Sequence, residues 1–488
     1  MPVDPSTATL LIDGEWRAGA SAFEVVDPAT LEVVARAADA GPQEALAALD
    51  AACAAAPSWR ETTAEDRATR LRAAASRVRA RADELAALMT GENGKPLHEA
   101  RGEIMGSARM LDWAAEEGRR ADGRVTARAA GGPGLVLRSP VGPALAITPW
   151  NFPASMLVRK VALALAAGCP VIVKPAEQTP MIGTELVRLI AEAGELPPGV
   201  LQSITTTRPA EVVGALLADP RLRKVSFTGS TDVGLSLIRA TEGHLRRTSL
   251  ELGGHSPAIV FDDADLPAAA AAAAAAKFAN AGQSCIAVNR LFVQRGVYEA
   301  FLPLLLERVA ALRPGHGADE GTTLGPLIDF AGLDKVERHV ADAVKRGATV
   351  AAGGRRWTPP PGEGARPGLT GAFYEPTVLT GADDSMLISS EETFGPVLPV
   401  YLFDDDDEAI ERANATEYGL AAYVFGSGLA RVWRAVDRLE FGIVAVNDAA
   451  PVRPELPFGG MKNSGQEREG GSEGIDAYLE TKSVSMKL

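Results

Sequence analysis

Short apolar runs alternate with amphipathic stretches between Pro143 and Leu252. The apolar runs predict buried strands, and apolar positions every three or four residues predict the helices between them. Strict alternation of the two favours right-handed crossovers and a parallel sheet with helices on both faces, a Rossmann-type α/β fold that binds ligands at the carboxyl ends of its strands. The expected strands are 144–148, 171–173, 200–204, 224–228 and 248–252, and the expected helices are 154–167, 180–193, 209–218 and one after Gly229.

The N-terminal segment predicts two extended pairs. Asp13-Gly14 separates the apolar run 8–12 from residues 15–17, and this dipeptide is a strong hairpin signal. A second extended pair is expected at 23–26 and 31–35.

Helical periodicity dominates residues 42–117, which are rich in alanine, arginine and leucine. We expect three helices there, broken near Pro57 and Gly94. A second set of strands and helices is expected from about Pro267 to Val446. The tail 478–487 alternates with a period of two, so it predicts a strand that needs a sheet edge, which another subunit could provide.

Composition is that of an ordinary soluble globular protein, with 46% hydrophobic and 23% charged residues among 488. This length predicts two large domains plus an appendage. The formal net charge of -14 excludes a basic stripe, so we expect no nucleic-acid partner.

Three cysteines, Cys53, Cys169 and Cys285, are too few for a disulfide framework, so we expect a reducing, cytoplasmic location. Neither their spacing nor that of the histidines fits a zinc site, and we expect no metal. The N-terminus does not read as a signal peptide, and the alanine run 268–276 is too short to span a bilayer, so we expect a core helix there and no membrane partner.

Two polar stretches are expected at the surface. Residues 359–368 predict a turn-rich loop. The acidic run 404–408 predicts a solvated loop before a helix rather than a metal site.

Cys285 follows Asn280-Ala-Gly-Gln-Ser, a polar turn between a helix and a strand. A lone cysteine is often a small buried hydrophobe, and we expect that of Cys53 and Cys169. A thiol at a glycine-containing turn can instead be exposed and nucleophilic.

Glu251 lies in the apolar strand Leu250-Glu-Leu252, where a carboxylate is costly without a partner or a task. It is either paired with an arginine or a general base with a raised pKa. Asn151 follows the first strand, where its amide could donate to an oxyanion or simply form a turn.

Residues 227–234 read as a strand, a small-residue turn and a helix, which would present N–H groups to a pyrophosphate. The segment is not G-x-G-x-x-G, so the generic dinucleotide fingerprint is absent. Lys174 and Glu177 close the second strand and suit ribose hydroxyls; Glu177 would repel a 2′-phosphate, which favours NAD over NADP.

Together these segments resemble the aldehyde dehydrogenase superfamily over nearly the whole chain. The matching motifs, in order, are Thr148-Pro-Trp-Asn-Phe-Pro153, Lys174-Pro-Ala-Glu177, Phe227-Thr-Gly-Ser-Thr231, Leu250-Glu-Leu-Gly-Gly254, Gly282-Gln-Ser-Cys285, Glu391-Glu-Thr-Phe-Gly-Pro396 and Pro457-Phe-Gly-Gly460.

The resemblance implies a mechanism. Cys285 would attack the aldehyde, the Asn151 side chain and the Cys285 N–H would hold the oxyanion, and hydride would leave for the nicotinamide. Glu251 would then activate water to hydrolyse the thioester, and Glu469 would relay protons. The implied cofactor is NAD, with NADP possible, and its implied contacts are Thr148, Pro149, Trp150, Asn151, Lys174, Glu177, Gly229, Ser230, Leu252, Glu392 and Phe394.

Within the superfamily the chain looks most like the succinate-semialdehyde dehydrogenase group, in which an arginine matching Arg159 binds the substrate carboxylate. Two residues depart from that pattern. Ala279 occupies the position of a second arginine, and Gly471 occupies the position of a serine that some members carry. A less polar aliphatic or aromatic aldehyde therefore stays an alternative substrate.

Two other classes stay as alternatives on the same fold. Coenzyme A-acylating relatives commonly lack the glutamate that Glu251 matches, so its presence favours hydrolysis. A non-catalytic structural protein would be expected to lose Cys285, Glu251 or Asn151.

The resemblance also implies three parts. An NAD-binding domain would take 1–121 and 141–253, and a catalytic domain 254–448. Residues 122–140 and 465–488 would form an oligomerisation element, in a homodimer or homotetramer.

Overall fold

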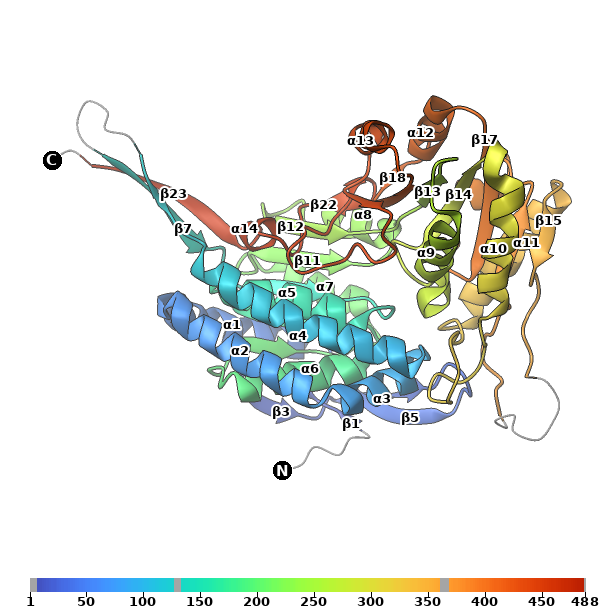
Figure 1. Ribbon diagram of the computed structural model, residues 1–488. Coiled ribbons are helices and arrows are strands. Elements are labelled where there is room, and N and C mark those ends of the chain that lie inside the picture. The colour runs from blue at the N-terminus through green and yellow to red at the C-terminus, as the bar shows by residue number, and fades with distance from the viewer. Residues whose placement is uncertain (1–6, 127–132, 360–367, 487–488) are drawn as a thin grey trace.

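The computed structural model describes residues 7–126, 133–359 and 368–486 as a body built on two large sheets, with a thin arm projecting from one end (Figure 1). No helix within these residues is long and apolar enough to cross a membrane.

The first large sheet has eight strands, and five central ones run parallel as the alternating pattern predicts. Antiparallel strands complete both edges, and the Asp13-Gly14 hairpin forms one of them. The order across the sheet is β22 (Gly465–Gln466), β12 (Arg247–Glu251), β11 (Lys224–Thr228), β8 (Ala144–Ile147), β9 (Val171–Lys174), β10 (Leu201–Ser203), β2 (Leu10–Ile12) and β3 (Glu15–Arg17).

Helices cover both faces of this sheet because side chains alternate along each strand. Ala144 and Ala146 of β8 pack into one apolar core and Leu145 and Ile147 into the other. The helices of this half are α1 (Pro42–Glu61), α2 (Ala64–Ala80), α3 (Ala82–Asn93), α4 (Leu97–Arg119), α5 (Pro153–Ala167), α6 (Pro180–Ala193), α7 (Pro209–Ala218) and α8 (Thr231–Ala240).

The prediction of a break at Pro57 is wrong: α1 continues through this proline. The buried face of α1 extends to Trp59, and its burial outweighs the hydrogen bond that proline removes. The chain turns instead at Thr63, which caps α2, and at Arg81, so residues 42–117 form four helices. The expected break at Gly94 is confirmed, and this glycine adopts a left-handed conformation.

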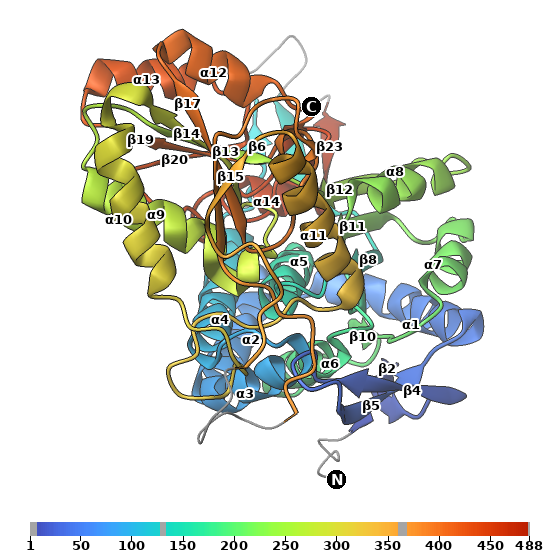
Figure 2. The same cartoon turned by 90° about the vertical axis from the view of Figure 1, so that its right-hand side faces the viewer.

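The second large sheet has seven strands, parallel except for β15 at one edge. Its order is β15 (Thr349–Ala352), β16 (Thr377–Thr380), β17 (Val397–Phe403), β14 (Val288–Gln294), β13 (Ser256–Val260), β19 (Ala421–Phe425) and β20 (Ile443–Val446). The helices around it (Figure 2) are α9 (Leu266–Phe278), α10 (Tyr298–Ala310), α11 (Phe330–Lys345), α12 (Asp406–Asn414) and α13 (Leu429–Arg438), with short turns η1 (Ala279–Gly282), η2 (Arg295–Val297) and η3 (Leu387–Ser389). The alanine run is a helix with one buried face, as predicted.

Three small sheets complete the fold. The arm joins the C-terminal strand β23 (Leu479–Ser485) to β7 (Gly134–Pro140) and β6 (Arg124–Val125), so the predicted tail strand pairs within its own chain. The short helix α14 (Glu473–Asp476) precedes it. The other small sheets are β1 (Thr7–Ala8) with β5 (Val33–Asp39) and β4 (Ser21–Val26), and β18 (Tyr418–Gly419) with β21 (Met461–Lys462).

Candidate active site

Cys285 lies in a tight loop between η1 and β14. Asn280 and Ala281 take left-handed backbone conformations there, with φ of 50° and 55°. A Cβ at Gly254 would overlap the Cys285 carbonyl oxygen, and one at Gly282 would overlap the Gly395 carbonyl. The two glycines therefore allow the loop to pack directly on neighbouring backbone.

The Cys285 thiol lies where two cavities meet. The α4 cavity, about 370 Å³, lies beside α4 and α5. The α8 cavity, about 410 Å³, lies beside the turn that starts α8. Asn151, Thr228 and Cys285 line both, so a thiol at this junction faces two separate ligand spaces.

Most of the expected cofactor residues gather around the α8 cavity. The lining ones are Pro149, Trp150, Asn151, Gly229, Ser230, Leu252, Glu392 and Phe394. Three others lie at the carboxyl ends of β8 and β9 without lining it: the Thr148 N–H donates to the Lys174 carbonyl at 3.1 Å, and the Lys174 Nζ pairs with the Glu177 carboxylate at 2.9 Å.

The α8 cavity has the features that a dinucleotide requires. Ser230 caps the ten-residue helix α8, whose N-terminal dipole favours a phosphate. Glu392 accepts the Gly254 N–H at 3.0 Å, and burial raises the pKa of this carboxyl to about 7. A Cβ at Gly253 would lie 3.2 Å from the Glu392 carboxylate, so a glycine keeps that side of the cavity open.

Sequence reasoning missed several residues of this cavity. Among them are Asp329, which precedes α11, Lys335, which lies in α11, and Gln283, which lies two residues before Cys285. Gln283 fixes the loop, since its side chain donates to the Asn280 carbonyl at 3.1 Å and accepts the Ile328 N–H at 2.8 Å. The motif containing Gln283 was visible in the sequence, whereas α11 carried no signal beyond its periodicity.

Hydrogen bonds fix both the side chain and the backbone carbonyl of Asn151. Its Nδ2 donates to the Gln283 carbonyl at 3.1 Å, and its own carbonyl accepts from the Lys95 Nζ at 2.8 Å and the Asn280 Nδ2 at 2.9 Å. The amide therefore lies in a fixed position in the wall that both cavities share with Cys285, and among the described residues its Nδ2 makes this one hydrogen bond.

Glu251 ends β12 and is buried, and neither carboxylate oxygen has a hydrogen-bond partner among the described residues. The alternative of an arginine ion pair is therefore wrong. Burial, together with the nearby Glu469, raises the pKa of Glu251 well above its ordinary value. Glu251 lines neither cavity; its Oε1 lies 2.8 Å from where a Gly459 Cβ would be.

Glu469 is buried beside it and, unlike Glu251, is paired. One carboxylate oxygen accepts from the Lys160 Nζ and from the Ser226 hydroxyl, the latter at 3.1 Å. The Glu469 carbonyl accepts from Arg159 at 3.2 Å. The buried Arg159 lines the α4 cavity with its guanidinium 5.1 Å from the Phe458 ring.

The Cys285 thiol is half-buried, and burial together with the Glu392 and Glu251 carboxylates raises its pKa. Cys169 is fully buried, as expected of a core cysteine, and its pKa is raised to about 11. Cys53 is only partly buried against a core, so that prediction holds in part. Cys285 alone of the three lines a cavity named above.

Comparison with known proteins identifies the family. The aldehyde dehydrogenase family model matches residues 16–484. This chain belongs to the aldehyde dehydrogenase family. It is 46% identical over 477 residues to the mitochondrial succinate-semialdehyde dehydrogenase of Rattus norvegicus, covering 97% of this chain and 89% of the relative. It is 44% identical over 481 residues to the succinate-semialdehyde dehydrogenase (NADP(+)) GabD of Escherichia coli (strain K12), covering 98% and 97%. A crystal structure of succinate-semialdehyde dehydrogenase from Burkholderia pseudomallei has a TM-score of 0.94, with 44% identity and 98% of each chain covered.

The two residues that depart from the family group have different surroundings. Ala279 is exposed at the end of α9 and lines neither cavity. Gly471 has φ of 58°, and a Cβ there would lie 2.9 Å from the Pro457 nitrogen, so the local backbone requires glycine. Neither Ala279 nor Gly471 therefore lines the α4 cavity of this aldehyde dehydrogenase.

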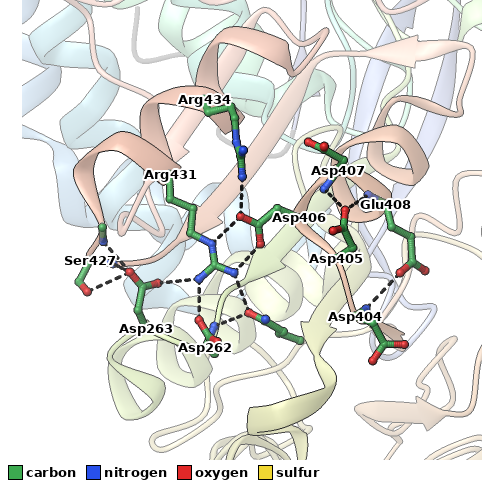
Figure 3. A network of polar contacts seen from close by, with 12 residues as sticks. Asp262, Asp263, Asp404, Asp405, Asp406, Asp407, Glu408, Ser427, Arg431 and Arg434 are labelled. Carbon is green, nitrogen blue, oxygen red and sulfur yellow. Dashed lines mark hydrogen bonds and ion pairs between the residues drawn. The ribbon is translucent and has the colours of Figure 1, made fainter.

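The carboxylates of the acidic run make contacts within the run and with arginine side chains (Figure 3). Asp405 caps α12, and Asp406 pairs with Arg431 and Arg434. The expected loop thus ends at Asp405, and the helix begins inside the run. The described residues contain no group of three metal-binding side chains. Residues 360–367 of the other expected surface loop lie outside the described part of the chain.

Proposed function

We propose that this chain oxidises an aldehyde to a carboxylic acid with NAD or NADP, and that the aldehyde is succinate semialdehyde or a similar semialdehyde. The observation that carries this proposal is the Cys285 thiol at the junction of two cavities. One cavity would hold the aldehyde and the other the dinucleotide, so both reach the same sulfur atom.

The Cys285 sulfur, as thiolate, bonds to the aldehyde carbon, and the carbonyl electron pair moves to oxygen. The Asn151 Nδ2 and the Cys285 N–H donate to that oxyanion. Trp150, Ser230 and Glu392 of the α8 cavity would hold a dinucleotide, which would supply the hydride acceptor; loss of hydride from the adduct would leave a thioester on Cys285. Because the thiol pKa is raised, this first stage accelerates as the pH rises.

Glu251 removes a proton from water in the second stage, and the resulting hydroxide attacks the thioester. Its free carboxylate oxygens suit this role. Glu469, fixed by Lys160 and Ser226 and near enough to raise the pKa of Glu251, would pass the proton onward. The cysteine thiol is then regenerated and the carboxylic acid leaves.

The substrate assignment rests on Arg159 and on the names of the relatives. Arg159 is a buried guanidinium in the wall of the α4 cavity, where it would pair with a substrate carboxylate. The second candidate is a less polar aldehyde, favoured by the apolar side chains of Met110, Met156, Ile286 and Phe458 in the same wall.

The cofactor contacts expected above are proposed for the α8 cavity, with Glu177 favouring NAD. The relative named with NADP(+) keeps NADP as the alternative. Thr148, Lys174 and Glu177 would then lie beyond the cavity, toward the ribose of the adenosine half.

The same proposal divides the chain into an NAD-binding domain (1–121 and 141–253), a catalytic domain (254–448) and an oligomerisation element (122–140 and 465–488). The two large sheets fall mainly within the first two parts. The projecting arm has exposed strand edges that a second copy could extend, in a homodimer or homotetramer. We propose a cytoplasmic location, which three free cysteines fit.

The deciding experiment compares kcat/KM for succinic semialdehyde, glutaric semialdehyde, aliphatic aldehydes and aromatic aldehydes, each with NAD and NADP and without coenzyme A. Product formation without coenzyme A is expected, with a bias toward the carboxylated members. Cys285→Ala should abolish oxidation. Undiminished oxidation by this variant would refute the mechanism, and a requirement for coenzyme A would favour the acylating alternative.

A further inference from the structure

A second arginine lines the α4 cavity. Arg109, on α4, is exposed at the cavity wall that also contains the buried Arg159 of α5. Neither the motifs nor the family resemblance pointed to it.

The packing of α4 on α5 brings the two arginines to the same level. The Glu103 carboxylate accepts the Ala154 N–H at 2.9 Å, and further along a Cβ at Gly118 would lie 3.1 Å from that of Ala166. The residue numbers of the contacting residues differ by 51 at the first contact and by 48 at the second. The numbers therefore increase in the same direction along both helices, so the helices are parallel. Both rise about 1.5 Å per residue, so Arg109 lies level with residues 157–160.

Two glycines of α4 leave room for the Arg109 guanidinium. A Cβ at Gly102 would meet nothing within 4 Å, and one at Gly106 would meet only the Arg109 Nη2, at 3.7 Å. The guanidinium therefore lies over Gly106, one turn toward the helix N-terminus.

Both guanidinium groups have donors available. Arg109 has no hydrogen bond or ion pair among the described residues, whereas Arg101 on the same helix pairs with Asp83. The Arg159 Nε is buried without a partner.

Two carboxylates also line the α4 cavity, and neither neutralises these arginines. Glu103 is paired with the buried Lys95 at 2.6 Å. Glu99 accepts the Asn280 N–H at 2.8 Å and lies about 10 Å along the helix axis from Gly106, over which the Arg109 guanidinium lies.

We propose that Arg109 and Arg159 together hold the anionic end of the substrate, so that Arg109 supplies the second positive charge that Ala279 cannot. This inference rests on the proposed function and specifies its substrate class: an aldehyde with a carboxylate at its far end. Two guanidinium groups from parallel helices can bracket one carboxylate, and such charge-assisted hydrogen bonds are stronger than neutral ones.

The test uses the full chain with saturating NAD or NADP and measures kcat/KM for succinic semialdehyde and for butanal, an uncharged aldehyde of the same length. Arg109→Gln should lower the ratio of the two values about tenfold, and Arg109→Lys should lower it less because it keeps the charge. Arg101→Gln is the matched control, since it removes one exposed arginine charge from α4 outside the cavity. This control should leave the ratio at the wild-type value.

The outcomes separate the two proposals. An unchanged ratio in Arg109→Gln, or an equal fall in Arg101→Gln, overturns the role of Arg109 and leaves the dehydrogenase activity intact. A wild-type chain that oxidises neither aldehyde overturns the proposed function itself. Because Arg109 is exposed, Arg109→Gln should fold normally, and an unchanged melting temperature checks this.

Discussion

Glu251→Gln is the sharpest perturbation that the site allows, because the replacement is isosteric and breaks no hydrogen bond. Both Glu251 oxygens lack partners among the described residues, so the amide displaces no donor. The change removes only the ability to accept a proton from water. We expect Cys285 to acylate as before and the thioester to accumulate.

The size of the effect follows from the role of the base. General bases contribute about 10²- to 10⁴-fold to a step, which corresponds to roughly 3–5 kcal/mol of activation free energy. Steady-state turnover should fall by about that factor, while a rapid burst of about one NADH per site remains. Stopped-flow absorbance of NADH measures both phases, and Cys285→Ala should give neither. Full steady-state turnover by Glu251→Gln would show that another group is the base.

The pH dependence of the stability of Glu251→Gln, compared with the wild type, gives an independent check because the direction of the difference can be predicted. The folded pKa of Glu251 is raised, so the unfolded chain loses this proton first and the folded state is penalised as the pH rises. Between the unfolded and folded pKa values, wild-type stability falls by about 1.4 kcal/mol per pH unit from this group. Glutamine does not titrate, so the variant should match or exceed the wild-type melting temperature, increasingly so above pH 5. A variant that is less stable at every pH would contradict the burial of an unpaired carboxyl.

Three further substitutions test other parts of the site. Asn151→Ala should lower kcat by about 10²- to 10³-fold through loss of an oxyanion donor, and a change confined to KM would contradict that role. Glu177→Ser should raise kcat/KM for NADP relative to NAD about tenfold by removing repulsion from the 2′-phosphate and freeing Lys174; an unchanged ratio would show that Glu177 does not select the cofactor. Burial raises the pKa of Glu99 to about 7, so KM for an anionic aldehyde should rise with pH through 7 in the wild type as this carboxyl ionises. In Glu99→Gln that rise should be smaller, as shown by KM measured across the pH range, and an identical profile would exclude Glu99 as its source.

Much of the parallel sheet could be predicted from the sequence because its strands are short, contain apolar residues and alternate with amphipathic helices. The helices at 180–193 and 209–218 have the predicted bounds. The predicted helix break at Pro57 was wrong because burial of one face of α1 outweighed the local effect of proline. That burial depends on the segments that pack against α1. Tertiary burial is not visible in a local window.

The site could be predicted only where its residues stand in unusual local contexts. A carboxylate in an apolar strand and a cysteine in a glycine-containing turn are such contexts. They singled out Glu251, which stays a proposed base, and Cys285, which lines both cavities. Arg109 and Lys335 are single charged residues on amphipathic helices that carry many others. Only the packing of those helices shows that their side chains face cavities.

The two buried carboxylates, Glu251 and Glu469, differ in their hydrogen-bond partners. Glu469 is tied to Lys160 and Ser226, so its charge is compensated where it lies. Among the described residues, neither Glu251 carboxylate oxygen has a hydrogen-bond partner, and burial together with the nearby Glu469 opposes its ionisation. Burial outweighs the attraction of Lys160, Arg468 and Arg159, so the Glu251 carboxyl holds its proton more tightly than an exposed glutamate does, as a general base requires. An arginine paired with Glu251 would stabilise the fold and weaken the proposed base, so we propose that the missing ion pair serves the function.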